Sequence, residues 1–161
     1  MYRFLITGHT SGIGKAIYER FGGIGLSKSC GFDIGSDSIT PFIDDCDVFV
    51  NNAFSTKDPW AQTDLVYQGK DKRQIVIGSN TTDQTKNFPH PYQSAKIALE
   101  NACNQLFYQG YDLTLLKPGY VDTPSVSSVK DRKMTTHNII EVIEWVLLQE
   151  FRIKDITFTP R

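Results

Sequence analysis

The sequence predicts one doubly wound α/β domain over residues 1–161, in which a parallel sheet carries helices on both faces. The first observation is that the short apolar runs carry apolar residues at successive positions rather than alternating ones, which suits strands buried on both faces of a parallel sheet. The second is that these runs alternate with longer helical patterns, because right-handed crossovers then place helices on both sides of the sheet. A length of 161 residues fits one such domain.

Seven segments show the apolar pattern of a buried strand. In chain order they are residues 4–6, 24–27, 32–34, 48–50, 75–77, 113–116 and 156–158. A glycine-rich turn follows the first of them and leads directly into a helical stretch that we expect to end near residues 22–23.

Two helical patterns in the second half of the chain are the clearest, at residues 91–108 and 136–151. We expect the second to bury one face, because its apolar residues recur at helical spacing. That face consists of Ile139, Ile140, Ile143, Val146 and Leu147.

The composition is that of a soluble globular protein, with 40% hydrophobic and 22% charged residues. A formal net charge of -1 argues against nucleic acid or an anionic membrane as the main partner, because such partners usually require an excess of basic residues. No apolar stretch approaches the roughly 18 residues of a membrane span, and the first residues show no signal-peptide pattern. We therefore expect a cytoplasmic protein that binds neither nucleic acid nor membrane.

The three cysteines, Cys30, Cys46 and Cys103, are widely spaced and form no CxxC pair. No histidine lies at zinc-ligand spacing from them. We interpret them as small, partly buried side chains in a reducing compartment, and we expect no metal site.

The clearest chemical motif is the glycine-rich turn at residues 7–14, which has the sequence TGHTSGIG and lies where a strand becomes a helix. Glycine allows the tight turn and the close approach of a pyrophosphate, while the helix N-terminus offers free N–H groups and a positive dipole. The turn therefore predicts dinucleotide binding. The residues that we expect to contact the cofactor here are Gly8, Thr10, Ser11, Gly12, Ile13 and Gly14.

Tyr92 and Lys96 are four residues apart on a predicted helix, so their side chains share one face. A phenol has a pKa of about 10 and is a poor acid or base at neutral pH, and a neighbouring ammonium favours its anion. The pair alone is a weak signal, because a surface tyrosine and a solvated helix lysine would look the same. Ser79, thirteen residues before Tyr92, follows the strand at 75–77 and could equally be a strand-end cap.

Together these motifs resemble the classical short-chain dehydrogenase/reductase family, which has a Rossmann-type fold. The glycine turn matches the family's TGxxxGIG, and Tyr92 with Lys96 matches its YxxxK. Asn51-Asn52-Ala53 is similar to its NNAG, with Phe54 in place of the glycine. Residues 118–123, PGYVDT, match its PGxxxT, and Ser79 stands at the separation of the family's catalytic serine.

The resemblance implies catalytic roles for three residues. Ser79 would hydrogen-bond the substrate carbonyl, Tyr92 would act as acid or base, and Lys96 would lower the pKa of the tyrosine and bind the nicotinamide ribose. It also implies cofactor contacts near the adenine ribose and the nicotinamide. The residues that would make them are Asn52, Ala53, Tyr92, Lys96, Pro118, Gly119, Val121 and Thr123.

The sequence departs from the family in two places. Many members carry an asparagine that anchors a proton-relay water on the helix before the serine strand, whereas residues 54–74 contain no asparagine. Gln62 and a backbone carbonyl are the candidates to replace it, and neither is favoured. Residues 124–133 leave little room for the family's usual pair of lid helices, which predicts an open, shallow site.

The choice of cofactor depends on the residues after the second strand. Ser27 and Lys28 stand there without a carboxylate, which favours the 2′-phosphate of NADP(H) over NAD(H). Asp33 is a competing candidate for the ribose, since it lies about twenty residues beyond Gly14. We interpret it instead as the family's aspartate after the third strand, which contacts the adenine amino group in the family, with Gly31-Phe32 at the beginning of that strand.

The leading hypothesis is an oxidoreductase that transfers a hydride between NADP(H) and a small-molecule carbonyl/alcohol substrate. The alternative is a catalytically silent dinucleotide-binding sensor or scaffold of the same fold. The helix at residues 91–108 pairs subunits in the family, so we also expect a homodimer or homotetramer. The sequence does not name the substrate.

Overall fold

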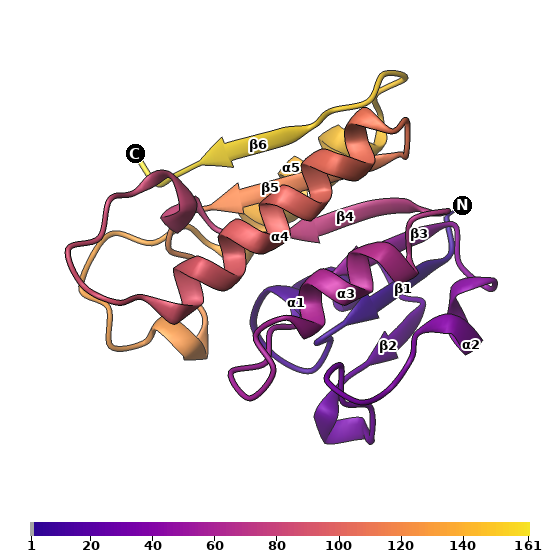
Figure 1. Cartoon of the computed structure of the whole chain (residues 1–161), viewed down its shortest axis with the longest axis horizontal. Coiled ribbons are helices and arrows are strands. Elements are labelled where there is room, and N and C mark those ends of the chain that lie inside the picture. The colour runs from indigo at the N-terminus through magenta and orange to yellow at the C-terminus, as the bar shows by residue number, and fades with distance from the viewer. Residues whose placement is uncertain (1) are drawn as a thin grey trace.

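The structure, a computed structural model, describes residues 2–161, and within them it contains one six-stranded parallel sheet. The strand order is β2-β1-β3-β4-β5-β6, so the chain starts one strand in from an edge, forms that edge with β2, and then builds from β3 to the opposite edge at β6 (Figure 1). The strands are β1 (Phe4–Thr7), β2 (Ile24–Leu26), β3 (Val48–Asn51), β4 (Arg73–Ile77), β5 (Leu113–Pro118) and β6 (Asp155–Phe158).

Helices cover both faces of the sheet, which confirms the predicted doubly wound fold. They are α1 (Gly12–Phe21), α2 (Thr40–Ile43), α3 (Ala61–Gln68), α4 (Pro91–Tyr108) and α5 (Thr136–Leu147). One face carries α1 and α5, which pack against each other, and the other carries α3 and α4 (Figure 1). Among the described residues, no helix combines the length and the apolar character that a membrane crossing requires.

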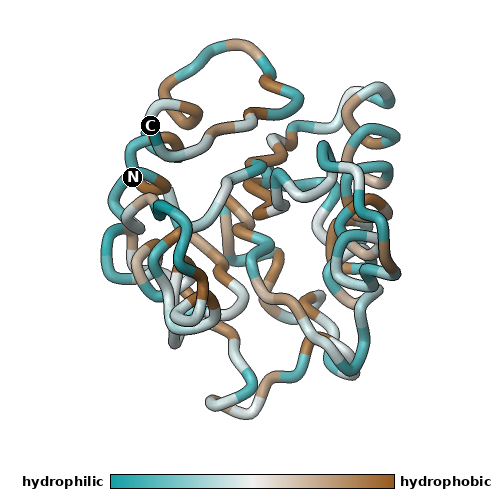
Figure 2. Tube along the Cα trace, turned by 90° about the vertical axis from the view of Figure 1, so that its left-hand side faces the viewer, coloured by the Kyte–Doolittle hydropathy of each residue, from teal (hydrophilic) through white to brown (hydrophobic). Residues whose placement is uncertain are grey.

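The strands β1, β3 and β5 are buried along their whole length, as their apolar runs predicted, whereas the edge strands β2 and β6 are only partly buried. Because successive side chains of a strand point to opposite faces, Ile6 and Val50 join the core under α1 and α5, while Leu5 and Phe49 join the core on the other side. Figure 2 shows hydrophobic segments running through the interior and hydrophilic ones on the outer loops.

The prediction of a strand at residues 32–34 is wrong. After β2 the chain makes a 3-10 turn at Lys28–Cys30 and then a loop, in which Asp33 Oδ1 accepts a hydrogen bond from the N–H of Gly35 and the N–H of Asp33 donates to Asp37. These side-chain bonds hold the backbone in a turn, which competes with strand pairing. The third strand of the sheet is therefore β3, and Asp33 does not follow a strand.

The last helix ends at Leu147 and not at residue 151 as predicted. The guanidinium of Arg73, at the start of β4, donates to the backbone carbonyls of Val146 and Leu147. The Val146 carbonyl also accepts the N–H of Gln149, so Arg73 adds a further partner there and stabilises the end of the helix at this point. The chain then turns toward β6 at the sheet edge.

Candidate active site

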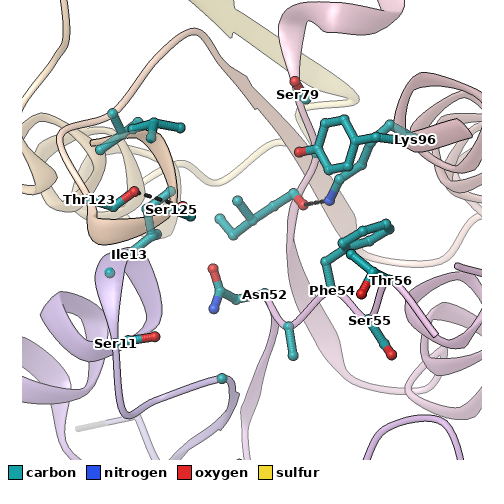
Figure 3. Close-up of a pocket in the computed structure, with 18 of the residues that line it drawn as sticks. Ser11, Ile13, Asn52, Phe54, Ser55, Thr56, Ser79, Lys96, Thr123 and Ser125 are labelled. Atoms are coloured by element: carbon teal, nitrogen blue, oxygen red, sulfur yellow. Dashed lines mark hydrogen bonds between the residues drawn. The ribbon is translucent and has the colours of Figure 1, made fainter. Parts of the chain in front are cut away.

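A cavity of about 920 Å³ lies along the carboxyl edge of the sheet. Because all strands are parallel, the segments that follow β1, β2, β3, β4 and β5 meet at this edge. Ser79, Lys96 and Phe54 lie on one side of the cavity, and Ser11 and Ile13 lie on the other (Figure 3).

Nearly all residues that the sequence nominated line this one cavity. Gly14 is the exception, because it lies behind the turn, where a Cβ atom would collide with the carbonyl of Gly8. The nominated residues along the cavity are Gly8, Thr10, Ser11, Gly12, Ile13, Ser27, Lys28, Asp33, Asn52, Ala53, Ser79, Tyr92, Lys96, Pro118, Gly119, Val121 and Thr123.

The glycine turn has the conformation that its sequence requires. Gly8 adopts a φ of 74°, a region that side-chain-bearing residues rarely enter, and its N–H donates to the carbonyl of Leu26 at 2.7 Å. The turn ends at Gly12, where the ten-residue helix α1 begins. The N-terminal N–H groups of α1 therefore face the cavity edge, an arrangement that favours an anionic group.

Thr7, which the sequence analysis did not single out, connects this turn to the segment after β3. Its buried hydroxyl accepts hydrogen bonds from the backbone N–H groups of Asn52 and Ala53, at 3.0 and 3.1 Å. The Asn52 side-chain amide donates to the Thr7 carbonyl at 3.0 Å. The NNA segment thus owes its position to the last residue of β1.

At the end of β2, Lys28 and Asp33 form an ion pair with 2.8 Å between Nζ and Oδ2. The hydrogen bond from Lys28 holds the pKa of the Asp33 carboxyl below its usual range. Beside this pair the hydroxyl of Ser29 contacts those of Ser27 and Thr10, at 3.1 and 3.0 Å. Lys28 and Asp33, the two competing determinants of cofactor preference in the sequence, therefore form an ion pair with each other.

Ser79 and Tyr92 come together from β4 and α4. Ser79 lies two residues after the end of β4 and caps the 3-10 turn Asn80–Asp83, since its hydroxyl accepts a hydrogen bond from the N–H of Thr81 at 3.2 Å. Tyr92 lies in the first turn of α4, which begins after His90 caps it. Burial raises the pKa of the Tyr92 phenol, and the Ser79 hydroxyl lowers it by a smaller amount.

Gln93 holds the segment after Ser79 in place. Its buried side-chain amide donates to the backbone carbonyls of Thr81 and Gln84. Because Gln93 directly follows Tyr92 in α4, it ties the serine segment to the helix that carries the tyrosine.

Lys96 is almost fully buried, with 4% of its surface exposed. Its ammonium donates to Gln62 Oε1 at 2.7 Å and to the backbone carbonyl of Ile77 at 3.1 Å. Burial without a carboxylate partner lowers the pKa of Lys96 to about 7. The pKa of Tyr92 is raised on balance, so the lowering that we expected from Lys96 is not found.

Phe54 is a part of the site that the sequence analysis noted only as a departure from NNAG. Its ring meets the Tyr92 ring edge-on at 5.0 Å between centroids, and the Lys96 ammonium lies 5.2 Å from its centroid. Lys96 is also 5.5 Å from the centroid of the Tyr92 ring. Two aromatic rings therefore lie against the buried ammonium.

The segment after β5 forms the remaining wall. Gly119 donates its N–H to the carbonyl of Phe158 in β6, and the Thr123 hydroxyl contacts that of Ser125 at 3.0 Å. In place of a pair of lid helices, the chain forms the short 3-10 turn Pro124–Val126, as the shortness of residues 124–133 predicted. The cavity is also lined by polar residues that had no signal in the sequence. They are Ser55, Thr56, Gln84, Lys86 and His90.

Comparisons with known proteins find the fold in solved structures only. No family model matches the sequence, and no curated protein sequence matches it. The 3-alpha-hydroxysteroid dehydrogenase from Pseudomonas sp. B-0831, solved with NADH, superposes with a TM-score of 0.73 at 16% identity, over 97% of this chain and 94% of that one.

Two further solved structures show the same similarity. A 3-oxoacyl (acyl-carrier-protein) reductase from Agrobacterium tumefaciens C58 with NADP bound has a TM-score of 0.70 at 20% identity, over 98% of this chain and 93% of that one. Serine dehydrogenase from Escherichia coli has a TM-score of 0.70 at 18% identity, over 96% of each chain. Similarity at this level of identity establishes architecture, and the chain has the fold of the short-chain dehydrogenases/reductases.

Proposed function

We propose that this protein is an oxidoreductase that transfers a hydride between NADP(H) and a small-molecule carbonyl/alcohol substrate. The observation that carries the proposal is the meeting of Ser79, Tyr92 and Lys96 at the cavity that the glycine turn also lines. A dinucleotide-binding turn without this cluster would suit many functions. The two together suit acid–base chemistry next to a bound nicotinamide.

The residues present fit a nicotinamide dinucleotide. The positive φ of Gly8 leaves the turn free of side-chain bulk, and the N-terminus of α1 offers unpaired N–H groups to a pyrophosphate. The cavity volume of about 920 Å³ suits a ligand of this size. When bound, the cofactor supplies or accepts the hydride.

The protein residues manage the proton and the substrate oxygen. The raised pKa of Tyr92 keeps its phenol protonated at neutral pH, so it is ready to donate a proton to the oxygen of a carbonyl undergoing reduction. The Ser79 hydroxyl, which acts on the pKa of Tyr92, donates a hydrogen bond to the same oxygen. Lys96, whose pKa is about 7, changes charge in the pH range where the site would work.

The preference for NADP(H) rests on the end of β2. Three hydroxyls, from Thr10, Ser27 and Ser29, contact one another and line the same cavity as Lys28, so this edge offers donors to a phosphate. Lys57 also lines the cavity and lowers the pKa of Asp33, so a second cation acts at this edge. The Asp33 carboxylate opposes a phosphate, and two lysines against one carboxylate favour the anion.

We also propose a homodimer or homotetramer that buries the outer surface of α4. Ile97 and Tyr108 of α4 and Tyr67 of α3 are exposed, although these helices pack side by side. Analytical ultracentrifugation of the wild type and of Ile97→Glu tests this. The wild type should sediment as an oligomer and the variant as a monomer, whereas a monomeric wild type would refute the proposal.

The test of the function is a parallel titration with NADPH and NADH, followed by an assay of NADPH oxidation with a panel of aldehydes and ketones. We expect NADPH to bind more tightly and Tyr92→Phe to keep that affinity while losing about 10²–10⁴-fold in rate. If Tyr92→Phe turns over as fast as the wild type, Tyr92 is not the acid. If neither nucleotide binds, the oxidoreductase proposal falls.

The second candidate is a dinucleotide-binding sensor or scaffold without turnover. The structural feature that favours it is the Lys96 ammonium, which already donates to Gln62 and to the carbonyl of Ile77 and lies against Phe54. Tight NADPH binding together with no turnover on the whole panel, and a Tyr92→Phe variant that behaves like the wild type, would favour this candidate.

A further inference from the structure

Gln62, on α3, connects three parts of the site through its buried side chain. The side chain is 2% exposed, and its Nε2 donates to the backbone carbonyls of Asn51 and Ile77, at 3.1 and 3.0 Å. Its Oε1 accepts from the Lys96 ammonium at 2.7 Å. The amide therefore joins the end of β3, the end of β4 and the middle of α4.

The orientation of this amide is fixed by its surroundings. An amide nitrogen can only donate and an amide oxygen can only accept. The two carbonyls require donors and the ammonium requires an acceptor, so the reversed amide would oppose all three neighbours. The backbone of Gln62 adds a further restraint, because its carbonyl accepts a hydrogen bond from the Asn51 side-chain amide at 2.9 Å.

The contact between the Lys96 ammonium and the Gln62 amide differs from the ion pairs that buried lysines usually form. A buried lysine usually faces a carboxylate, which keeps it charged. Here the two acceptors are neutral, the Gln62 amide and the Ile77 carbonyl, and the rings of Phe54 and Tyr92 lie against the ammonium. A neutral acceptor fixes the position of the ammonium while leaving it able to lose a proton.

We propose that Gln62 is a positioning residue of this site, which holds the Lys96 ammonium next to Tyr92 and favours its charged form through a neutral hydrogen bond. Gln62 does not touch the reacting atoms and acts through Lys96. The inference rests on the proposed function only for the use that the site makes of Lys96. The contact itself can be tested without any turnover.

The test follows the titration of Lys96 by NMR of protein with ¹³C-labelled lysine, and the signal is assigned by its loss in Lys96→Met. Gln62→Met keeps the length of the side chain and removes the acceptor. The matched control is Gln74→Met, because Gln74 is a buried glutamine of β4 whose amide donates to Val66 and does not contact Lys96.

The wild-type Lys96 should titrate near pH 7. In Gln62→Met we expect the midpoint to fall by roughly one pH unit, because a hydrogen bond to the charged form is lost. Gln74→Met should keep the wild-type midpoint even where it lowers the melting temperature. An unchanged midpoint in Gln62→Met, or an equal fall in both variants, would overturn the proposal.

A second measurement covers the case in which Gln62→Met does not fold. In the wild type, nuclear Overhauser contacts should join the ε-protons of Lys96 to the γ-protons of Gln62, and their absence would refute the contact. Neither readout depends on a cofactor or a substrate. A midpoint shift without any reductase activity would therefore support the role of Gln62 and refute the proposed function separately.

Discussion

The ammonium of Lys28 lies 2.8 Å from the carboxylate of Asp33, and the pair borders the cavity at the end of β2. Both side chains keep considerable solvent contact, so their attraction is screened. The carboxylate nevertheless offsets the attraction of Lys28 for an anion at the same place. The charge balance of this pair, rather than either residue alone, governs the choice between the two nicotinamide cofactors in our proposal.

Replacing Asp33 with asparagine should therefore strengthen the preference for NADPH. Asparagine keeps the acceptor that receives the Gly35 N–H and removes the negative charge. We expect NADPH affinity to rise about three- to tenfold at low salt, with less change for NADH, and the gain to shrink as salt increases. Fluorescence titrations at two salt concentrations measure this.

Lys28→Met provides the complementary variant, for which NADPH affinity should fall relative to NADH. If Asp33→Asn strengthens the binding of both nucleotides equally, the 2′-phosphate does not lie beside Lys28. The proposed preference would then lose its structural basis.

Removing the ring of Phe54 should raise the pKa of Lys96. Burial is the main reason that this pKa is low, and the Phe54 ring covers one side of the ammonium. In Phe54→Ala water reaches the ammonium, which favours its charged form more than the lost cation–π contact disfavours it. The midpoint of Lys96, measured by lysine ¹³C NMR, should move from about pH 7 to clearly higher values.

Phe88→Ala is the matched control, because Phe88 is an exposed phenylalanine that packs against His90 and not against Lys96. Its Lys96 midpoint should equal that of the wild type. A Phe54→Ala midpoint that stays at the wild-type value would mean that other groups keep water from the ammonium.

The sequence predicted those features that depend on local patterns. The strands were recognisable because apolar residues stand at successive positions, and the glycine turn because residues other than glycine rarely adopt the φ of Gly8. The helix α4 was predicted with its observed bounds, since Pro91 begins it and its apolar residues recur at helical spacing. The nominated residues line one cavity because they follow parallel strands, whose carboxyl ends meet at one edge of the sheet.

The features that the sequence did not predict depend on contacts between distant segments. Residues 32–34 have the apolar character of a strand, but the side-chain bonds of Asp33 hold them in a turn. Gln62 was one of two candidates to replace the family's asparagine, and the sequence favoured neither. Its contact with Lys96 joins two residues that are 34 positions apart in the chain, so no local pattern indicates it. The position of Phe54 against Tyr92 likewise has no local signal in the sequence.

Lys117, the buried lysine near the end of β5, should matter for stability. Its ammonium contacts the carboxylates of Asp83 and Glu100, and so joins β5 to α4 and to the turn that follows Ser79. Lys117→Met leaves both carboxylates without this partner. We expect a loss of about 2 kcal/mol in the free energy of unfolding, below the usual cost for a fully buried pair because the carboxylates are partly exposed.

Urea denaturation measures this loss, with Lys154→Met as the control. Lys154 pairs with Asp155 at 2.8 Å in a more exposed position, so its replacement should cost less than about 1 kcal/mol. Equal losses in the two variants would show that Lys117 contributes no more than a surface ion pair.

The pH dependence of stability should carry the signature of Lys96. Its pKa is about 7 in the folded protein, whereas an unfolded lysine has a pKa of about 10.4. Between these values the unfolded chain binds more protons than the folded one, so the free energy of unfolding rises with pH. The contribution is constant below about pH 7, where Lys96 is protonated in both states.

The pH range in which this rise can be assigned to Lys96 ends near pH 8.5, because above it Cys103 begins to lower the free energy of unfolding as the pH increases. Burial raises the pKa of its thiol to about 12, so above the ordinary thiol range the unfolded chain loses a proton that the folded chain keeps. Between pH 7 and 8.5 we expect Lys96 to add roughly 1–2 kcal/mol to the free energy of unfolding. Lys96→Met should remove this rise in urea denaturation at several pH values, whereas Lys15→Met, at an exposed position of α1, should retain it. If Lys96→Met retains the wild-type slope, the buried ammonium keeps its charge across this range, and the hydrogen bonds that it donates to Gln62 and to the Ile77 carbonyl outweigh the effect of its burial.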